Sequence, residues 1–422
     1  MNFENYIVHI TTHKKEDDLN HPLNNFSNYE SSGTGFYIDK GLILTCFHVV
    51  KNSLKILVET YNLNGEIFNN KANIKYIFPQ DDLAVIEVED KNINFSVFEY
   101  YILTQKINNL EVNTVGFPLN STTLKINQGV ISGYQDSNIQ TDSTLNSGNS
   151  GGPLLYNNKV IGINQSKLSG EATNTGYAIP IFRFLISYKL KFSELKLINY
   201  KPELLFTYQE NKQEFHKCKN GVRISSMHNN SFLHKYNIFV DDIILKINGI
   251  KINKNGKISF SFFPEKINLK DIFYWFTVGD NITLTILSNK ENTISDKVVT
   301  LEYFETNLLK FYKEIDRKYF FESNGLIFSV ITDYHLDNMR SLEMSFTDKV
   351  KIMSRYLTIN HIFTIYLSDL IYSKLKFTEY PLREIITHIN DIEIVDYESL
   401  LNIMKNPVNK IKTIDNDVYF IN

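Results

Sequence analysis

The chain has little of several features whose absence excludes whole classes of protein. Its 422 residues include only 2 cysteines, Cys46 and Cys218, which excludes a disulfide framework and a cysteine-based zinc site. No apolar run approaches the roughly 18 residues that a membrane-spanning helix requires. No nucleotide-binding loop of the form G-x-x-x-x-G-K-S/T occurs. The net charge of −3, without a basic tract, gives no general attraction to nucleic acid, so we expect neither a nucleic-acid partner nor a membrane span.

The remaining composition is that of a globular protein with more than one domain. Hydrophobic residues make up 43% and charged residues 22% of the chain, and 422 residues exceed what one ordinary core accommodates. The N-terminal sequence MNFENYIVHITTHKKEDD has acidic residues and no basic leader before an apolar core. Together with the scarcity of cysteine, this predicts a cytoplasmic location.

Short strand-like segments fill the chain as far as Pro180. Segments such as GTGFYID, GLILTCF, LAVIEVE, KVIGINQ and GYAIP are rich in β-branched or aromatic residues and are bounded by Gly, Asn, Asp or Pro. Many short strands of this kind predict an all-β barrel or sandwich. The segment IFRFLISYKLKF, residues 181–192, has helical periodicity and predicts a helix that closes this unit.

A second unit is predicted from about residue 197, and part of its sequence is repeated near the C-terminus. The segments VDDIILKINGIKI (residues 240–252) and LREIITHINDIEI (residues 382–394) are identical at six of thirteen positions. Either a duplicated module or the high content of Ile and Asn accounts for this similarity. We place the three units at residues 1–195, 196–305 and 306–422.

The segment TLNSGNSGGPLL gathers several glycines around Ser150. Glycines stand where the backbone needs an unusual φ or a close approach, so Ser150 is either a turn residue or a nucleophile on a constrained loop. A serine hydroxyl becomes a nucleophile when a base takes its proton and a carboxylate orients that base. The choice between the two depends on whether the chain supplies these partners.

Two residues at strand ends are candidates for the partners. His48 directly follows the apolar segment GLILTCF, and Asp82 directly precedes the segment LAVIEV. Taken singly, each is better explained as a structural histidine or a solvated turn aspartate. As a set, the order His48, Asp82, Ser150 is that of the chymotrypsin clan. The backbone amides of Gly148 and Ser150 are then the predicted oxyanion hole.

Together these motifs resemble those of the HtrA/Deg serine proteases, which are trypsin-like barrels followed by PDZ domains. GTGFYIDKGLILTCFHVV resembles the strand that leads to the catalytic histidine, and DLAVIEV resembles the aspartate strand. QTDSTLNSGNSGGPLL resembles the serine loop, and GYAIP the strand behind the specificity pocket. The resemblance implies Ser150 as nucleophile, His48 as general base and Asp82 as its orienting carboxylate. It implies no catalytic role for the nearby Asp81 and Asp142.

The later units are similar to PDZ domains, and the long insertion at residues 254–276 resembles the plant-type Deg branch. The expected fold is mostly β: a chymotrypsin-like double β-barrel protease domain followed by PDZ-like α+β domains, the second of them degenerate. The segment KPELLFTYQ lacks the glycine expected in a PDZ carboxylate-binding loop, which leaves peptide capture by this unit open.

Two residues of the protease domain differ from what the resemblance leads one to expect or need an interpretation of their own. Cys46 is interpreted as a small buried side chain, and Ser147 stands where the family usually has proline.

The resemblance to a trypsin-like barrel also locates the pocket for the side chain that precedes the scissile bond. None of its predicted residues is acidic, so a Lys or Arg side chain would be desolvated there without a counter-charge. We therefore expect cleavage after Val, Ala, Leu or Ile. The predicted pocket residues are Thr144, Leu145, Ile163 and Gln165, with residues 176–178 as a further wall.

The predicted function is that of an ATP-independent serine endopeptidase that cleaves unfolded or damaged proteins through an acyl-enzyme, without cofactor or metal. The alternative is a PDZ-bearing chaperone or scaffold whose protease domain is inactive at rest, because an intact triad is compatible with a collapsed serine loop. The family resemblance further implies unfolded polypeptides as partners and a homo-oligomer built from one or more trimers.

Overall fold

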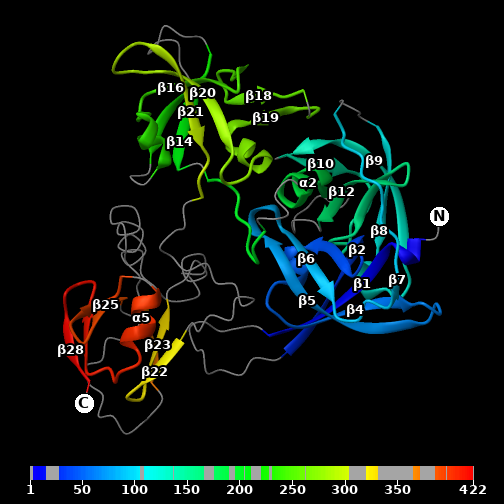
Figure 1. Ribbon diagram of the computed structural model, residues 1–422, viewed down its shortest axis with the longest axis horizontal. Helices are drawn as coiled ribbons and strands as arrows, with labels where there is room; N and C mark the ends of the chain where they lie inside the picture. Colours follow the sequence, from blue (N-terminus) through cyan, green and yellow to red (C-terminus); the bar gives the residue numbers. More distant parts are fainter. Residues whose placement is uncertain are drawn as a thin grey trace. The chain divides into compact units, whose positions relative to one another are not determined.

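The first part of the chain folds into two six-stranded β-barrels (Figure 1). One compact unit comprises residues 1–14 and 29–304, and a second comprises residues 15–28 and 305–422. No helix in the described part of the chain is long and apolar enough to cross a bilayer. The computed structural model describes residues 3–15, 28–104, 109–135, 137–165, 175–189, 195–203, 205–210, 220–227, 231–261, 263–303, 320–330, 365–370, 385–395 and 397–421.

The first barrel is closed by the pairing of its first and fourth strands. Its strands are β1 (Ile7–Lys15), β2 (Asn28–Asp39), β3 (Leu42–Cys46), β4 (Ser53–Asn62), β5 (Ile67–Phe78) and β6 (Leu83–Val88). They pair in the order β1, β2, β3, β6, β5, β4, and β4 pairs again with β1. A short strand, β7 (Ile93–Asn94), is added beside β4. β3 is buried along its whole length, as its continuous apolar sequence predicts.

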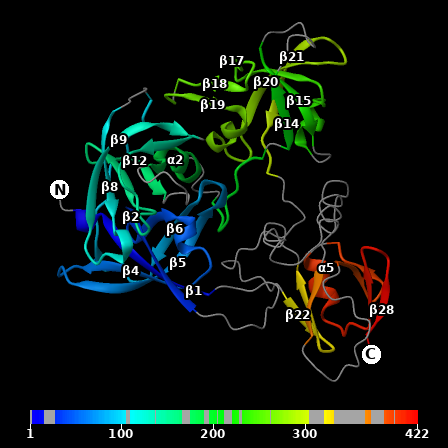
Figure 2. The same ribbon diagram turned by 180° about the vertical axis from the view of Figure 1, so that it is seen from behind.

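The second barrel follows directly, and both views show it beside the first (Figure 2). Its strands close in the order β10, β13, β12, β11, β8, β9. The predicted chymotrypsin-like double barrel is thereby confirmed. The bounds of these strands are β8 (Glu111–Gly116), β9 (Lys125–Gln135), β10 (Asn138–Thr141), β11 (Pro153–Tyr156), β12 (Lys159–Gln165) and β13 (Gly176–Pro180).

The helix predicted over residues 181–192 forms as α2 (Ile181–Lys189), and residues 190–192 lie outside the described part. The chain after it returns to the first barrel. The Ile77 N–H donates to the Leu197 carbonyl over 2.7 Å, and the Asn199 N–H donates to the Ile77 carbonyl over 2.9 Å. Residues 197–199 therefore extend the sheet beside β5 in a parallel bridge. The predicted boundary between residues 195 and 196 stays a prediction, but the residues that follow it pack with the barrel.

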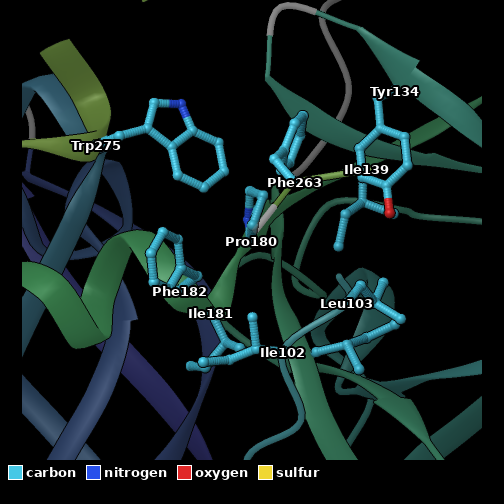
Figure 3. A pocket seen from close by; sticks show the side chains of 10 residues that line it. Ile102, Leu103, Tyr134, Ile139, Pro180, Ile181, Phe182, Phe263 and Trp275 are labelled. Carbon is cyan, nitrogen blue, oxygen red and sulfur yellow. The ribbon is translucent and has the colours of Figure 1, made fainter. Parts of the chain in front are cut away.

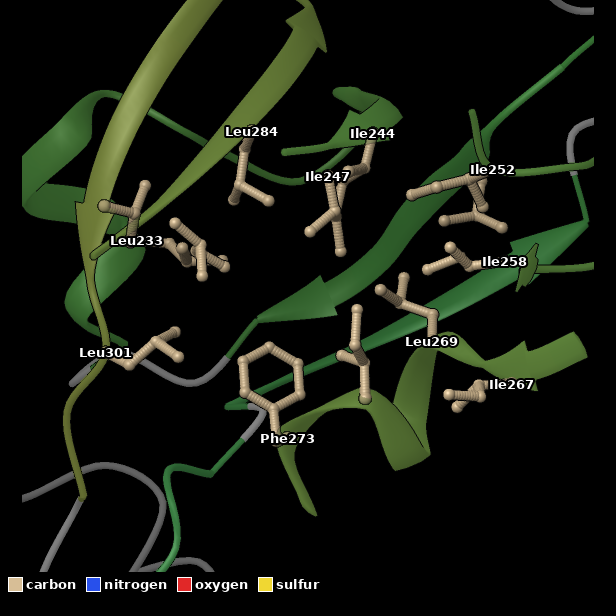
Figure 4. Close-up of a cluster of buried hydrophobic side chains, with 14 of the residues drawn as sticks. Leu233, Ile244, Ile247, Ile252, Ile258, Ile267, Leu269, Phe273, Leu284 and Leu301 are labelled. Atoms are coloured by element: carbon tan, nitrogen blue, oxygen red, sulfur yellow. The ribbon is translucent and has the colours of Figure 1, made fainter. Parts of the chain in front are cut away.

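A separate five-stranded sheet with a short sixth strand forms between residues 206 and 300. Its strands pair in the order β14 (Phe206–Glu210), β15 (Val222–Met227), β16 (Ile243–Ile247), β20 (Asn281–Leu287) and β21 (Ile294–Thr300), with β17 (Ile250–Lys251) beside β16. Branched aliphatic side chains from the sheet, among them Ile244, Ile247 and Leu284, meet Leu269 and Phe273 in one core (Figure 4).

Two short 3-10 helices and a hairpin pack with this sheet. The first 3-10 helix, Phe232–Tyr236, is capped by the Ser231 hydroxyl, which accepts from the Leu233 N–H. The insertion forms a hairpin of β18 (Lys257–Ser259) and β19 (Lys266–Asn268) and then a second 3-10 helix, Leu269–Trp275.

The second compact unit contains another antiparallel sheet. Its strands pair in the order β22 (Phe320–Ser323), β23 (Leu326–Val330), β24 (Ile365–Leu370), β25 (Ile385–Ile389), β27 (Lys410–Thr413) and β28 (Val418–Phe420), with β26 (Ile392–Glu393) beside β25. The helix α5 (Tyr397–Ile403) contributes the buried Leu400 and Ile403 to the core of this sheet.

The two similar sequence segments form matching β-hairpins, β16–β17 and β25–β26. Both turns begin with an asparagine of positive φ, Asn248 and Asn390, each with φ 48°. The Asn248 side-chain oxygen accepts from the Thr283 N–H over 2.8 Å, and that of Asn390 accepts from the Lys410 N–H over 3.1 Å. The turn alone does not favour duplication, because Asn157 in the β11–β12 hairpin also has φ 48°, but the matching cross-strand contact favours a duplicated module.

Candidate active site

The general-base candidate His48 lies on the short helix α1 (Phe47–Val50), directly after β3. Phe47 is buried and its N–H donates to the Asp82 carbonyl over 2.9 Å, which fixes the start of the helix. The His48 side chain is 43% exposed. The buried strand β3 thus places the partly solvent-exposed imidazole of His48 at the rim of the first barrel.

The carboxylate candidate Asp82 directly contacts this imidazole. Asp82 Oδ2 lies 2.7 Å from His48 Nδ1, and Asp82 Oδ1 accepts from the His48 backbone N–H over 3.0 Å. Because an ionised carboxylate can only accept hydrogen bonds, the proton of neutral His48 resides on Nδ1. His48 Nε2 is then unprotonated and can accept a proton from a nucleophile.

A third donor to the carboxylate comes from the second barrel. The Gln165 side-chain N–H₂ at the end of β12 donates to Asp82 Oδ2 over 2.9 Å. The sequence predicted Gln165 as a pocket wall, whereas the structure directs its amide to the candidate triad. Nothing in the local sequence signals this contact, because Gln165 and Asp82 are 83 residues apart.

These contacts keep Asp82 ionised. Burial by itself would raise the pKa of the Asp82 carboxyl, but the hydrogen bonds and charge of His48, with the hydrogen bond from Gln165, hold that pKa below its ordinary value of 3.8. A carboxylate in this state fixes the tautomer of His48 and stabilises the imidazolium that forms when the base is protonated.

Acid titration is expected to detect the lowered pKa of Asp82. A folded-state pKa below 3.8 means that the carboxylate stabilises the fold fully above that value and loses this contribution as the pH falls through the folded-state pKa. In a Ser150→Ala background, which prevents self-digestion, the difference in unfolding free energy caused by Asp82→Asn should be constant near neutral pH and shrink in acid. Chemical denaturation at a series of pH values measures it. A difference that already shrinks near neutral pH would contradict this assignment.

The loop that carries Ser150 is held by Thr34 of β2. The Thr34 N–H donates to the Ser150 carbonyl over 2.9 Å, and the Thr34 hydroxyl donates to the Gly148 carbonyl over 2.7 Å. Gly151 has φ 85°, and a Cβ there would overlap the Thr34 carbonyl oxygen. The glycines of the serine loop thus permit a close approach to β2. The role of Thr34 was not predicted, although its place between Gly33 and Gly35 indicates a tight backbone contact.

The peptide groups that carry the two predicted oxyanion-hole amides are fixed by hydrogen bonds to their carbonyls. The Ser147 carbonyl accepts from the Leu119 N–H over 2.6 Å, and the Asn149 carbonyl accepts from the Gly152 N–H over 3.1 Å. Because N–H and C=O point in opposite directions across a trans peptide, these bonds fix the direction of the Gly148 and Ser150 amides. The roles of these amides stay predictions.

Of the other predicted pocket residues, Thr144 and Leu145 precede Ser150 in the chain and Ile163 follows it. Leu145 is buried and lies so close to Gly176 that a Cβ there would come within 2.8 Å of it. Ile163 is fully buried on β12, opposite Ile179 of β13. Thr144 is exposed, and its carbonyl accepts from the Asn127 side chain over 3.2 Å. Leu145 and Gly176 are thus close neighbours, and the roles of these residues as pocket walls stay predictions.

The two aspartates predicted to be non-catalytic have separate contacts. The exposed Asp142 accepts from the Val130 N–H over 2.6 Å. Asp81 is buried and paired with Arg183, whose Nε lies 2.8 Å from Asp81 Oδ1. Within the described part of the chain, neither carboxylate is hydrogen-bonded to His48.

Cys46, His48 and Asp82 form a group whose potential metal-binding atoms all lie within 4.8 Å of one another. His48 and Asp82 are hydrogen-bonded to each other, and the Cys46 thiol donates to the Asn164 carbonyl over 3.3 Å. Burial, together with the charge of Asp82, raises the pKa of the Cys46 thiol well above its ordinary value, which disfavours a thiolate ligand. The group is better suited to proton transfer than to metal binding.

Comparison with known families agrees with this geometry. Residues 33–163, which include His48, Asp82 and Ser150, match the family model described as a trypsin-like peptidase domain. This part of the chain is a trypsin-like peptidase domain. Both barrels contribute to it, because the match begins in β2 and ends in β12.

Relatives that extend beyond the peptidase domain carry Deg/HtrA names. The putative protease Do-like 13 of Arabidopsis thaliana is 27% identical over 318 residues, which cover 70% of this chain and 63% of that protein. The serine protease Do-like HtrB of Bacillus subtilis is 31% identical over 278 residues, 59% of this chain and 57% of that protein. Human serine protease HTRA3 is 30% identical over 300 residues, 63% of this chain and 62% of that protein. The chain therefore spans less than two thirds of these relatives.

The fold is shared with solved proteases. The structure of the HtrA-type protease AlgW with decapeptide aligns with a TM-score of 0.53 and 19% identity, over 72% of this chain and 96% of that chain. The predicted resemblance is confirmed for the peptidase domain and for the Deg/HtrA relatives. The identification of the later sheets as PDZ domains stays a prediction.

Proposed function

We propose that the chain is a serine endopeptidase in which Ser150 attacks peptide bonds of unfolded polypeptides. The observation that carries this proposal is the 2.7 Å contact between His48 Nδ1 and Asp82 Oδ2 inside a trypsin-like peptidase domain. The serine loop of that domain is fixed by Thr34, so nucleophile and base are held by adjacent elements of the two barrels.

The proposed reaction uses only side chains, backbone amides and water. His48 Nε2 takes the proton of the Ser150 hydroxyl as its oxygen attacks the scissile carbonyl carbon, and Asp82 stabilises the resulting imidazolium. The amides of Gly148 and Ser150 donate to the oxygen that becomes negative. Imidazolium then gives its proton to the leaving amine, an acyl-enzyme remains on Ser150, and water activated by His48 hydrolyses it.

The proposed substrates are unfolded or damaged polypeptides, which the chain would cleave without ATP, cofactor or metal. Exposed aliphatic segments of unfolded chains match the apolar character of Leu145 and Ile163 in the predicted pocket. We further propose a cytoplasmic location and a homo-oligomer of one or more trimers, both of which rest on the sequence alone.

A fluorophosphonate probe tests the proposed nucleophile. Its phosphorus reacts with a serine oxygen activated by a neighbouring base, so we expect a covalent adduct on Ser150, located by mass spectrometry, together with casein hydrolysis. The alternative, a chaperone with a resting protease domain, predicts no adduct, no hydrolysis and suppressed aggregation of an unfolded protein. An adduct at another serine would overturn the assignment of the nucleophile.

The predicted pocket gives a testable preference for cleavage sites. We expect cleavage of casein after Val, Ala, Leu or Ile, with loose selectivity among them, because one methylene in an apolar pocket changes transition-state binding by only about 1–3 kcal/mol. Mass spectrometry of the fragments identifies the residue before each cut. Predominant cleavage after Lys or Arg would refute the pocket.

Two matched variants, compared by the cleavage sites that they produce in casein, test whether Leu145 lines the pocket. Leu145→Ala should widen it and shift cleavage toward larger side chains such as Phe. Leu103 has the same 8% exposure but packs in the core of the second barrel with Ile139 and Ile161. Leu103→Ala should therefore destabilise the fold without changing the cleavage pattern.

A further inference from the structure

A cluster of three charged side chains is buried beside the candidate triad. Asp81, the residue before Asp82, has a fully buried side chain, and those of Arg183 and Lys201 are each 5% exposed. Arg183 Nη2 lies 2.6 Å from Asp81 Oδ1, and Lys201 Nζ lies 3.4 Å from Asp81 Oδ2. Buried charges are retained where partners compensate their loss of hydration, so the three side chains depend on one another.

The backbone next to this cluster is strained. Asp82 has φ 53°, in the left-handed region that non-glycine residues rarely adopt. The turn is held by the Asp82 N–H, which donates to the Pro79 carbonyl over 3.2 Å, and by its own carbonyl, which accepts from Phe47. Strained residues persist only when their surroundings over-determine them. The buried anchor at Asp81 is one such restraint, one residue away from the carboxylate that orients His48.

The anchor is completed by groups from outside the two barrels. Arg183 lies on α2, and its guanidinium carbon lies 4.1 Å from the ring centre of Tyr274. The Lys201 ammonium donates to the Tyr274 carbonyl over 3.1 Å. Tyr274 belongs to the 3-10 helix Leu269–Trp275, which packs with the later sheet. Through Lys201, the cluster thus connects the Asp82 turn to Tyr274, which lies 73 residues after Lys201 in the chain.

Apolar contacts hold the same helix against the second barrel. Trp275 packs on Phe182 of α2 with ring centres 5.1 Å apart and on Phe263 at 4.5 Å, and Phe263 contacts Tyr134 of β9 at 5.1 Å. Figure 3 shows these rings around Pro180. Tyr274 is therefore presented to Arg183 and Lys201 by a packed aromatic surface.

We propose that Asp81, Arg183 and Lys201 form a positioning cluster that holds the strained Asp82 turn in register with His48. Lys201 and the Tyr274 segment then support catalysis although neither touches the reacting atoms. This proposal rests on the proposed endopeptidase function, because Asp82 has to be oriented only if His48 acts as a base.

The test removes the lysine and leaves the Asp81–Arg183 pair intact. Lys201→Met retains the length and the apolar stem of the side chain, so the fold should survive, as circular dichroism will show. Because a displacement of about 1 Å at a catalytic group lowers the rate by about 10²-fold, we expect kcat on a short peptide to fall by up to that factor with KM nearly unchanged. Arg223→Met is the control, because it removes an ion pair with Asp241 of 2.8 Å that is remote in sequence from the triad. It should leave kcat unchanged.

A spectroscopic measurement separates this proposal from the proposed function. The proton between His48 Nδ1 and Asp82 gives a low-field NMR signal whether or not the chain hydrolyses peptides, assigned by its loss in Asp82→Asn. In Lys201→Met this signal should shift or broaden, and it should be unchanged in Arg223→Met. An unchanged signal in Lys201→Met, or a wild-type kcat, would overturn the positioning role. A wild-type chain without hydrolysis or labelling at Ser150, but with a signal sensitive to Lys201, would instead refute the endopeptidase function.

Discussion

Replacement of Ser150 by alanine is expected to lower kcat for peptide hydrolysis by about 10⁴- to 10⁶-fold, because nucleophile, base and carboxylate act as a unit. The fold should persist, since the contact that holds the loop here is the Ser150 carbonyl with the Thr34 N–H, and alanine retains that carbonyl. Initial rates on a fluorogenic peptide, with circular dichroism of the same samples, measure both quantities.

The control for this variant is a second buried serine of the same region. The Ser143 hydroxyl lies 2.8 Å from the Thr114 hydroxyl and donates to the Asn127 carbonyl over 3.2 Å, so its hydrogen bonds in the described part of the chain are with residues outside the triad. Ser143→Ala should therefore lower stability modestly and retain most of the activity. If Ser150→Ala retains more than a few per cent of wild-type kcat, the assignment of the nucleophile is wrong.

Asp82→Asn is expected to lower kcat by about 10⁴-fold by favouring the wrong imidazole tautomer. Three donors point at the carboxylate: the backbone N–H and Nδ1 of His48, and the amide of Gln165. Asparagine has one acceptor oxygen. If that oxygen takes the place of Oδ1, it accepts the hydrogen bond from the His48 backbone N–H. The new NH₂ group then takes the place of Oδ2 and donates to His48 Nδ1. The proton of the neutral imidazole therefore resides on Nε2. His48 then cannot accept the Ser150 proton.

Asparagine fits the position of Asp82, so the variant should change the hydrogen bonding of His48 without changing the backbone. It adopts the left-handed conformation of Asp82 more readily than most residues, so the turn should form. The matched control is Asp142→Asn, because the exposed Asp142 accepts from the Val130 N–H and lies outside the contacts of His48. Steady-state rates of the two variants should differ by orders of magnitude. Similar losses in both would show that Asp82 is not the orienting carboxylate.

Much of the fold could be predicted because its signals are local. The strands next to His48 and Asp82 are continuous apolar segments with polar ends. The serine loop is recognisable by its closely spaced glycines. Such patterns depend on neighbouring residues alone. The mostly β fold followed from these patterns, the trypsin-like domain followed from the resemblance of the motifs to those of HtrA/Deg proteases, and both are confirmed.

The residues that support the candidate site could not be predicted in this way. The residues of each supporting contact are far apart in the chain: Thr34 and Gly148 are separated by 114 residues, and Gln165 and Asp82 by 83. The local sequence around either partner therefore does not predict the contact. Asp81 was interpreted only as a residue without catalytic function. Its burial with Arg183 and Lys201 becomes visible once the barrels, α2 and the following segment are brought together.

The parallel bridge between β5 and residues 197–199 has a consequence for how this region opens. The Ile77 and Asn199 amides donate to carbonyls of each other's segments, so they should exchange with deuterium slowly and at a common rate. Release of the Tyr274 carbonyl from Lys201 need not disturb this bridge. Residues 197–199 are therefore expected to stay paired with β5 when the contact between Lys201 and Tyr274 opens.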